Sequence, residues 1–339
     1  MKALILAAGA GTRLFPYTLS SPKHMMPIAN KPLLEYNVEQ VASMGIKELG
    51  IVVGHRKEQI MGYFGDGKKW GLKITYIEQE KRMGISHAIL TAEKFIGNDK
   101  FVVILGDNLF MDDLSQQMGE FLSSGAEAGI GVQKVADGRF FGIVEIRDGK
   151  VLDIIEKPEK PASDIASVGL YFFSSPKVFG VIRKQKPSAR GELEIADTLM
   201  GLVRSGSHVK PLWIKKRWKD TGRRSELLDA NRAILGDMNE NRVSKDAAVT
   251  GSEIIPPCVI GEGCIISKSR IGPFVSMGNG CRVEGARISE SIICEGTEIR
   301  FSEPIKNSII GRMCKVIKKG NSSISVNIGD HSEIIEDGL

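Results

Sequence analysis

The stretch LILAAGAGTRL, residues 4–14, joins an apolar run to a glycine-rich turn that carries an arginine. An apolar run that stops at glycine predicts a short buried strand, and glycines let backbone N–H groups approach a polyphosphate closely. Arg13 and the later Lys23 can neutralise phosphate charge. No Gly-Lys-Ser/Thr follows, so this is not a Walker A loop, and Leu14 occupies the place of the third glycine of the dinucleotide fingerprint. The stretch therefore predicts a phosphate-binding loop of another kind.

Short apolar runs alternate with amphipathic stretches from this loop through residue 235. The runs predict strands at residues 3–7, 49–53, 73–77, 101–105, 130–135, 141–146 and 168–173, and helical spacing predicts crossover helices at 33–44 and 88–95. This alternation is typical of a layered α/β sandwich with a mainly parallel sheet. Ligands of such sheets bind beyond the carboxyl ends of the strands, so the loops after Leu6 and Leu105 are the first candidates for a site.

The pattern changes after about residue 245, where apolar residues recur every six positions. Apolar-glycine pairs such as Ile260-Gly261 and Ile271-Gly272 accompany this spacing, with slips to five residues at 266–271 and 305–310. Each hexapeptide supplies one short strand and one turn, so residues 250–318 predict roughly four coils of a parallel β-helix. The sequence thus predicts two domains, residues 1–240 and 241–339.

Composition limits the class of function. Of the 339 residues 42% are apolar, 26% are charged and 6% are aromatic, and the net charge is +5. Basic residues form no single stripe interleaved with aromatics, which disfavours a nucleic-acid binder, and no segment is apolar for long enough to span a membrane. The five cysteines never form a Cys-x-x-Cys pair and lie in the repeat region, so we expect buried reduced thiols and a cytoplasmic protein.

The loop also shares a longer motif with a known family. GAGTRL is followed by Ser21-Pro22-Lys23 and by Asn30-Lys31-Pro32, and this order resembles the signature of sugar-1-phosphate nucleotidylyltransferases, with the long-form thymidylyltransferase branch most similar. The resemblance implies a Rossmann-like, glycosyltransferase-A-type nucleotidyltransferase sandwich followed by a left-handed parallel β-helix. It also implies direct attack of a sugar phosphate oxygen on the α-phosphorus of a nucleoside triphosphate, with magnesium and no covalent enzyme intermediate.

Two carboxylates resemble the metal ligands of this family. Asp107 lies in the string Leu105-Gly106-Asp107-Asn108, and Asp220 lies in Trp218-Lys219-Asp220-Thr221-Gly222. Two carboxylates from distant strands suit Mg²⁺, which prefers few protein ligands together with waters and phosphate oxygens. The resemblance therefore implies a magnesium site at Asp107 and Asp220.

The remaining site residues are implied by matches in the family's order. Arg13, Lys23 and Lys157 take the catalytic roles, in which they stabilise charge on the phosphates. The implied nucleotide contacts are Leu6, Ala8, Gly9, Gly11, Thr12, Gln79 and Gly84, with Gln79 and Gly84 at the pyrimidine edge. The implied sugar-phosphate contacts are Gly142, Glu156, Lys157, Val168, Gly169 and Trp218. The run from Arg190 to Asp197 is expected to be architectural, capping and orienting a helix.

Several alternatives stay open. The resemblance implies that dTTP and glucose 1-phosphate give dTDP-glucose. Ala7-Ala8-Gly9 and Lys81-Arg82-Met83 depart from the family's usual pattern, so UTP with glucose or N-acetylglucosamine 1-phosphate is the alternative. Hexapeptide coils also occur in acetyltransferases, but His331 is the only histidine in the tail and lies near its end. A non-catalytic regulatory subunit is disfavoured because all the motifs are present. The β-helix is expected to support a homo-oligomer.

Overall fold

A computed structural model of the protein describes residues 1–174, 176–318 and 327–335. The chain forms two compact units. The first comprises Met1–Gly9 and Leu34–Asp220, and the second comprises Ala10–Leu33 and Thr221–Leu339. This division differs from the expected ranges 1–240 and 241–339, because the glycine loop and helix α8 (Arg224–Met238) group with the tail. The tail's first strand, β14 (Asn241–Val243), begins at the expected boundary.

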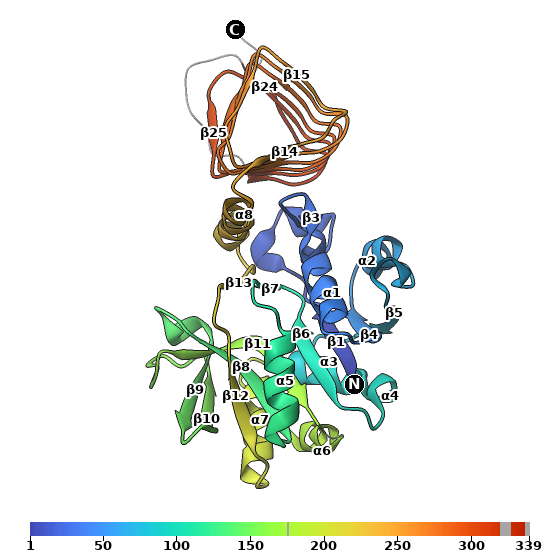
Figure 1. The fold of residues 1–339 in the computed structure, drawn as a ribbon, viewed down its shortest axis with the longest axis vertical. Helices are drawn as coiled ribbons and strands as arrows, with labels where there is room; N and C mark the ends of the chain where they lie inside the picture. The colour runs from blue at the N-terminus through green and yellow to red at the C-terminus, as the bar shows by residue number, and fades with distance from the viewer. Residues whose placement is uncertain (175, 319–326, 336–339) are drawn as a thin grey trace. The chain divides into compact units, whose positions relative to one another are not determined.

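The first unit is built on a nine-stranded mixed sheet (Figure 1). Four parallel strands lie in the order β6-β1-β4-β5, and β11 pairs antiparallel to β6. Strand β8 pairs with β11 and β12, while β9 and β10 form an antiparallel hairpin beside β11. The strands are β1 (Lys2–Ala7), β4 (Glu48–Val53), β5 (Lys73–Glu78), β6 (Phe101–Leu105), β8 (Ala128–Lys134), β9 (Gly142–Arg147), β10 (Lys150–Glu156), β11 (Ile165–Phe173) and β12 (Val209–Trp213).

Helices cover both faces of this sheet. Neighbouring residues of a strand point to opposite faces. Phe173 stacks on Phe101, which stacks on Phe179 of α6, whereas Phe172 stacks on Phe121 of α5. The unit is therefore the three-layered α/β sandwich that the sequence predicts. Its helices are α1 (Leu33–Ser43), α2 (Lys57–Phe64), α3 (Ile85–Thr91), α4 (Glu93–Ile96), α5 (Ser115–Ser124), α6 (Lys177–Lys184) and α7 (Ile195–Arg204).

The tail in the second unit is a parallel β-helix whose coils are triangular in projection (Figure 1). Its three sheets are formed by β14-β17-β20-β23-β26-β28, by β15-β18-β21-β24-β27-β29 and by β16-β19-β22-β25. Paired positions lie 16 to 18 residues apart, as in Ser276 with Ile292, Cys258 with Val275 and Ile309 with Asn327. The strands are β14 (Asn241–Val243), β15 (Ala248–Thr250), β16 (Glu253–Ile254), β17 (Cys258–Ile260), β18 (Ile265–Ser267), β19 (Arg270–Ile271), β20 (Val275–Met277), β21 (Arg282–Glu284), β22 (Arg287–Ser289), β23 (Ile292–Ile293), β24 (Glu298–Phe301), β25 (Pro304–Lys306), β26 (Ile309–Ile310), β27 (Lys315–Lys318), β28 (Asn327–Ile328) and β29 (Glu333–Ile335).

The interior of the β-helix is filled by Ile, Val, Met and Cys side chains from successive coils. All five cysteines are free and buried, as the sequence predicts. Burial raises the pKa of Cys258 to about 11 and that of Cys294 to about 12, because a thiolate loses its hydration there. Cys258 and Cys294 therefore act as small apolar filling groups. No helix among the described residues is long and apolar enough to cross a membrane.

The loop between β1 and α1 packs on the β-helix within the second unit. It contains three short 3₁₀ turns, Thr12–Leu14, Tyr17–Leu19 and Lys23–Met25, and the strand pair β2 (Pro27–Ile28) and β3 (Lys31–Pro32). The buried Tyr17 hydroxyl donates to the Ile309 carbonyl at 2.6 Å, and Ser20 Oγ donates to Asp330 Oδ2 at 2.8 Å. The glycine loop is therefore anchored to late coils of the tail.

Candidate active site

The two carboxylates expected to bind metal are brought together by a short pair of strands. Strand β6 ends at Leu105, Asp107 follows in the turn, and β7 (Asn108–Phe110) begins at once. Strand β13 (Trp218–Asp220) runs antiparallel to β7 and places Asp220 opposite Asn108. Asp220 is thereby the cross-strand neighbour of the residue that follows Asp107, and both carboxylates are half-buried.

Asn108 fixes the geometry around this strand pair. Its Nδ2 donates to Asp107 Oδ1 at 3.4 Å, and its Oδ1 accepts a hydrogen bond from Trp218 Nε1 at 2.6 Å. The Trp218 ring also meets Phe141 edge-on, with 5.4 Å between ring centroids. Gly169 has φ 71°, and a Cβ there would lie 2.7 Å from Asn108 Nδ2. Only glycine therefore fits beside Asn108 with this backbone conformation.

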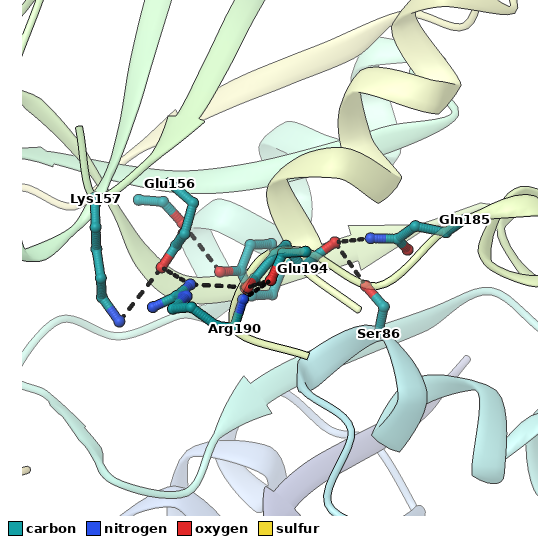
Figure 2. A network of polar contacts seen from close by, with 9 residues as sticks. Ser86, Glu156, Lys157, Gln185, Arg190 and Glu194 are labelled. Atoms are coloured by element: carbon teal, nitrogen blue, oxygen red, sulfur yellow. Dashed lines mark hydrogen bonds and ion pairs between the residues drawn. The ribbon is translucent and has the colours of Figure 1, made fainter. Parts of the chain in front are cut away.

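Two of the residues expected on the sugar side, Glu156 and Lys157, lie next to each other and to Arg190 (Figure 2). Glu156 Oε1 lies 3.5 Å from Lys157 Nζ and 3.5 Å from Arg190 Nη2. Arg190 also pairs with the buried Glu194 carboxylate at 2.9 Å. Gly142 lies opposite Glu156 in the β9–β10 register, and a Cβ there would come within 3.0 Å of Glu156 Oε2. The structure thus brings Gly142, Glu156 and Lys157 together.

The buried Tyr171 phenol is influenced by the charges of both Glu156 and Asp107. Its buried hydroxyl shares a hydrogen bond of 3.0 Å with Ser167 Oγ. Burial raises the pKa of Tyr171, and the negative charges of Glu156 and Asp107 raise it further. Both carboxylates therefore lie within electrostatic reach of one phenol. Val168, an expected sugar-side contact, is buried on the same strand, β11.

The residues expected at the pyrimidine edge also meet. Gln79 directly follows β5, and its backbone N–H donates to the Val53 carbonyl at 2.9 Å. Its side chain is buried, with Nε2 lying 3.4 Å from the Gly84 carbonyl and 2.9 Å from His87 Nδ1. Gly84 is the residue that precedes helix α3.

The expected phosphate-loop residues divide between the two units. Leu6, Ala8 and Gly9 lie at the carboxyl end of β1 in the first unit. In the second unit Gly11 has φ 67°, and a Cβ there would lie 2.9 Å from both Lys23 Cβ and Thr18 Cγ2. Gly11 therefore permits the close approach of the Lys23 and Thr18 side chains. Thr12 and Arg13 are exposed in this loop, and Lys23 is half-buried.

Four residues of the site region were not identified from the sequence as contributors to it: Asn108, Tyr171, Arg190 and His87. Asn108 directly follows Asp107 in the sequence, and this position next to an expected metal ligand could have indicated a role in the site. Tyr171, Arg190 and His87 are brought in by strand pairing and by side-chain reach, which no local pattern encodes. The expected capping role of the run after Arg190 is corrected, because Glu194 makes no side-chain cap to α7 and pairs with Arg190 instead.

Comparisons with known proteins agree on one family, and the similarity to curated relatives extends over nearly the whole chain. The nucleotidyl transferase family model matches residues 2–236. The chain is 38% identical to a glucose-1-phosphate thymidylyltransferase of Streptomyces antibioticus, covering 98% of this chain and 99% of that protein.

Two solved structures resemble the sandwich. A candidate glucose-1-phosphate thymidylyltransferase from Bacillus anthracis, solved with sucrose, aligns with a TM-score of 0.66 and 36% identity, covering 71% of this chain and 98% of that chain. A UDP-glucose pyrophosphorylase in complex with UDP-glucose aligns with a TM-score of 0.64 and 29% identity, covering 70% of this chain and 98% of that chain. Because these alignments cover only 71% and 70% of this chain, part of the chain has no counterpart in either structure.

Proposed function

Because the chain belongs to the nucleotidyl transferase family and is a sugar-1-phosphate nucleotidyltransferase, we propose that it makes dTDP-glucose from dTTP and glucose 1-phosphate. A phosphate oxygen of the sugar phosphate attacks the α-phosphorus of dTTP, the new P–O bond forms, and pyrophosphate leaves. The pairing of β7 with β13, which sets Asp220 opposite Asn108, the residue that follows Asp107, is the observation that carries this proposal.

The donor set at this strand pair fits Mg²⁺. Asp107 and Asp220 supply hard carboxylate oxygens, the ligand type that Mg²⁺ prefers. Among residues 1–174, 176–318 and 327–335 no group of three or more His, Cys, Asp or Glu side chains gathers to hold a metal. A cation held by only two carboxylates retains positions for water and phosphate oxygens. When bound, Mg²⁺ would neutralise charge on the reacting phosphates.

The chain's own residues position the two substrates and stabilise the negative charge on their phosphates. Arg13 and Lys23 bind the triphosphate, and Lys157 binds the phosphate of the sugar. Glu156 accepts hydrogen bonds from sugar hydroxyls, and its contacts with Lys157 and Arg190 support that orientation. A phosphate monoester is largely dianionic at neutral pH, so the attacking oxygen needs no general base. Catalysis then depends on positioning and electrostatic stabilisation.

The remaining contacts complete the proposed assignment. Gln79 and Gly84 read the pyrimidine, and Leu6, Ala8, Gly9, Gly11 and Thr12 supply backbone and side-chain contacts to the nucleotide. Gly142, Val168, Gly169 and Trp218 line the sugar side. UTP is the alternative donor, because the UDP-glucose pyrophosphorylase has a similar fold at 29% identity. We also propose a homo-oligomer, which analytical ultracentrifugation tests directly.

The decisive experiment measures Mg²⁺-dependent pyrophosphate release over a grid of dTTP, UTP, CTP, ATP and GTP with glucose, galactose, mannose and N-acetylglucosamine 1-phosphates. The proposal expects the highest kcat/KM for dTTP with glucose 1-phosphate. A maximum with UTP would retain the reaction and change the donor. No turnover anywhere in the grid, by a folded protein, would reject the catalytic assignment and favour a regulatory subunit.

A further inference from the structure

The amide of Gln79 is held in one orientation by its surroundings. Its Nε2 lies 3.4 Å from the carbonyl oxygen of Gly84. A backbone carbonyl can only accept hydrogen bonds, so the NH₂ side of the amide must face Gly84. The reverse orientation would set two carbonyl oxygens against each other in a buried position, where the Gln79 side chain is only 6% exposed.

His87 engages the second hydrogen of the same amide. Its Nδ1 lies 2.9 Å from Gln79 Nε2. With the NH₂ group facing this way, Nδ1 must accept, so the neutral imidazole carries its proton on Nε2. Both N–H bonds of the amide are then directed at protein acceptors. Among the residues that the structure describes, none donates a hydrogen bond to Gln79 Oε1.

The imidazole is itself held in place by helix α3. The Ser86 N–H and hydroxyl tie the start of this helix to the Leu193 carbonyl at 3.1 Å and to the Glu194 carbonyl at 3.0 Å. Thr91 Oγ1 donates to the His87 carbonyl at 2.8 Å one turn later. The half-buried His87 ring therefore acts on Gln79 from a fixed position.

A fixed acceptor selects a base that carries a matching donor. Uracil and thymine have an N3–H donor between two carbonyl oxygens, whereas cytosine has an unprotonated acceptor at N3. Gln79 Oε1 matches the first pattern and opposes the second. If the amide could rotate freely, it would offer a donor or an acceptor and would distinguish these bases poorly.

We propose that His87 is a positioning residue that fixes the amide of Gln79 with its oxygen toward the base, and thereby selects uracil or thymine over cytosine. This inference rests on the proposed function, because it assigns a base contact to Gln79. His87 does not touch the reacting atoms and acts only through Gln79.

The test compares two substitutions with the wild type. His87→Leu removes the acceptor at similar volume, and His87→Gln restores one through its amide oxygen. Dissociation constants for dTTP, UTP and CTP with Mg²⁺ are measured by calorimetry, alongside KM for both substrates and kcat. His87→Leu should weaken binding of the preferred nucleotide about tenfold, reduce its preference over CTP by a similar factor, and change KM for glucose 1-phosphate less than about twofold. His87→Gln should recover most of the preference.

The outcomes separate this inference from the proposed reaction. An unchanged preference in His87→Leu, or an equal loss of preference in His87→Gln and His87→Leu, would overturn the role of His87. An equal increase of both KM values would also overturn it, because it would indicate a general disturbance of α3. If the wild type binds dTTP or UTP selectively but releases no pyrophosphate, the reaction is rejected, and the binding ratios of the variants still decide the role of His87.

Discussion

Charged and buried polar side chains lie close together in the sequence and in the strand pairing after the end of β6. Asp107 lies in the turn before β7, and Asp220 on β13 lies opposite Asn108, which is buried and hydrogen-bonded on both sides of its amide. A divalent cation held by both carboxylates would offset the repulsion between their charges. Function is therefore expected to be most sensitive to removal of their charge.

Asp107→Asn and Asp220→Asn should each lower kcat/KM at least about 100-fold, because loss of a ligand removes several kcal/mol of charge stabilisation. The fold should persist, since both positions are only half-buried. Pyrophosphate release and circular dichroism together measure this. Asp148→Asn is the matched control, because Asp148 is exposed at φ 49° in the β9–β10 turn, a conformation that asparagine adopts readily. Near-normal activity of either site variant would contradict the metal assignment.

Lys157→Ala should raise KM for glucose 1-phosphate about 10-fold or more while leaving KM for the nucleotide within about twofold, because a charged hydrogen bond to phosphate is lost. Lys157 is exposed and its Nζ lies 3.5 Å from Glu156, a weak surface pair whose loss barely affects stability. Initial-rate kinetics with each substrate varied in turn give both constants. Lys160→Ala, an exposed lysine three residues later, serves as the control. Equal shifts of both KM values would remove Lys157 from the sugar side.

At the scale of strands and helices, the pairing of β7 with β13 is the feature on which the site depends. Each strand has three residues, so backbone hydrogen bonds alone hold it weakly. The bond from Trp218 Nε1 to Asn108 Oδ1, 2.6 Å long, adds a side-chain link across the pair. Removing that link leaves a buried amide oxygen without its donor.

Trp218→Phe should therefore lower kcat and raise the Mg²⁺ concentration needed for half-maximal rate several-fold, while the melting temperature falls by a few degrees at most. Magnesium titration of the rate and calorimetry test this. Trp213→Phe is the control, because Trp213 is 40% exposed at the end of the neighbouring strand β12. An unchanged magnesium dependence in Trp218→Phe would show that the strand pair tolerates loss of the link.

Long apolar elements could be predicted from sequence and short or irregular ones could not. The expected strands at 3–7, 49–53 and 101–105 agree with β1, β4 and β6 within one residue, because their buried runs are bounded by polar residues or glycine. The single helix expected at 88–95 is two helices, since Ala92 leaves helical geometry with ψ 3°. Strand β12 was not predicted because it contains Pro211, which is accommodated at the sheet edge. Strands β7 and β13 are too short to show a period.

The sequence of the repeat region predicted a parallel β-helix, and the strand pairing explains why its apolar residues are not spaced by six throughout. Most paired positions lie 17 residues apart, so one side of each coil is a residue short of three full hexapeptides. The slips to five-residue spacing at 266–271 and 305–310 mark these shorter sides. The proposed site residues come from sequence motifs, whereas the contacts of His87 with Gln79 and of Arg190 with Glu156 are defined only by the folded chain.

Over the whole molecule, all five tyrosines have a raised pKa, with burial as the largest cause in each. The pKa of Tyr76, the least affected, is about 12. The unfolded chain ionises its tyrosines near pH 10, so it releases protons that the folded chain retains. Stability is therefore unaffected by these groups below about pH 10 and decreases as the pH rises above it.

Absorbance at 295 nm should consequently show little phenolate in the native protein at pH 11 and ionisation of all five tyrosines once urea unfolds it. The urea midpoint should fall steadily between about pH 10 and pH 12. Several phenolates in the native state at pH 11, with an unchanged urea midpoint, would contradict the burial described.

Tyr17→Phe should destabilise the protein by about 1–3 kcal/mol, because the Ile309 carbonyl loses its buried partner. It should also lower kcat, since the loop that carries Arg13 and Lys23 loses an anchor on the β-helix. Thermal unfolding and pyrophosphate release measure both effects. Tyr76→Phe is the control, because the Tyr76 hydroxyl also donates to a backbone carbonyl, that of Gly65 at 2.7 Å, but this bond is exposed and the residue is only half-buried, whereas Tyr17 is buried. Equal stability of the two variants would show that the loop is held by other contacts.

The anchoring of this loop also constrains how the protein is made. Tyr17 is synthesised 292 residues before its partner Ile309. At about 5 to 20 residues per second, synthesis of that interval takes on the order of 15 to 60 s. The sheet of the first unit, whose last strand ends at Trp213, can form during this time, whereas the phosphate loop must wait for a late coil. A nascent chain on the ribosome therefore holds an assembled sandwich with an unanchored loop until the coil that contains Ile309 has been synthesised and folded.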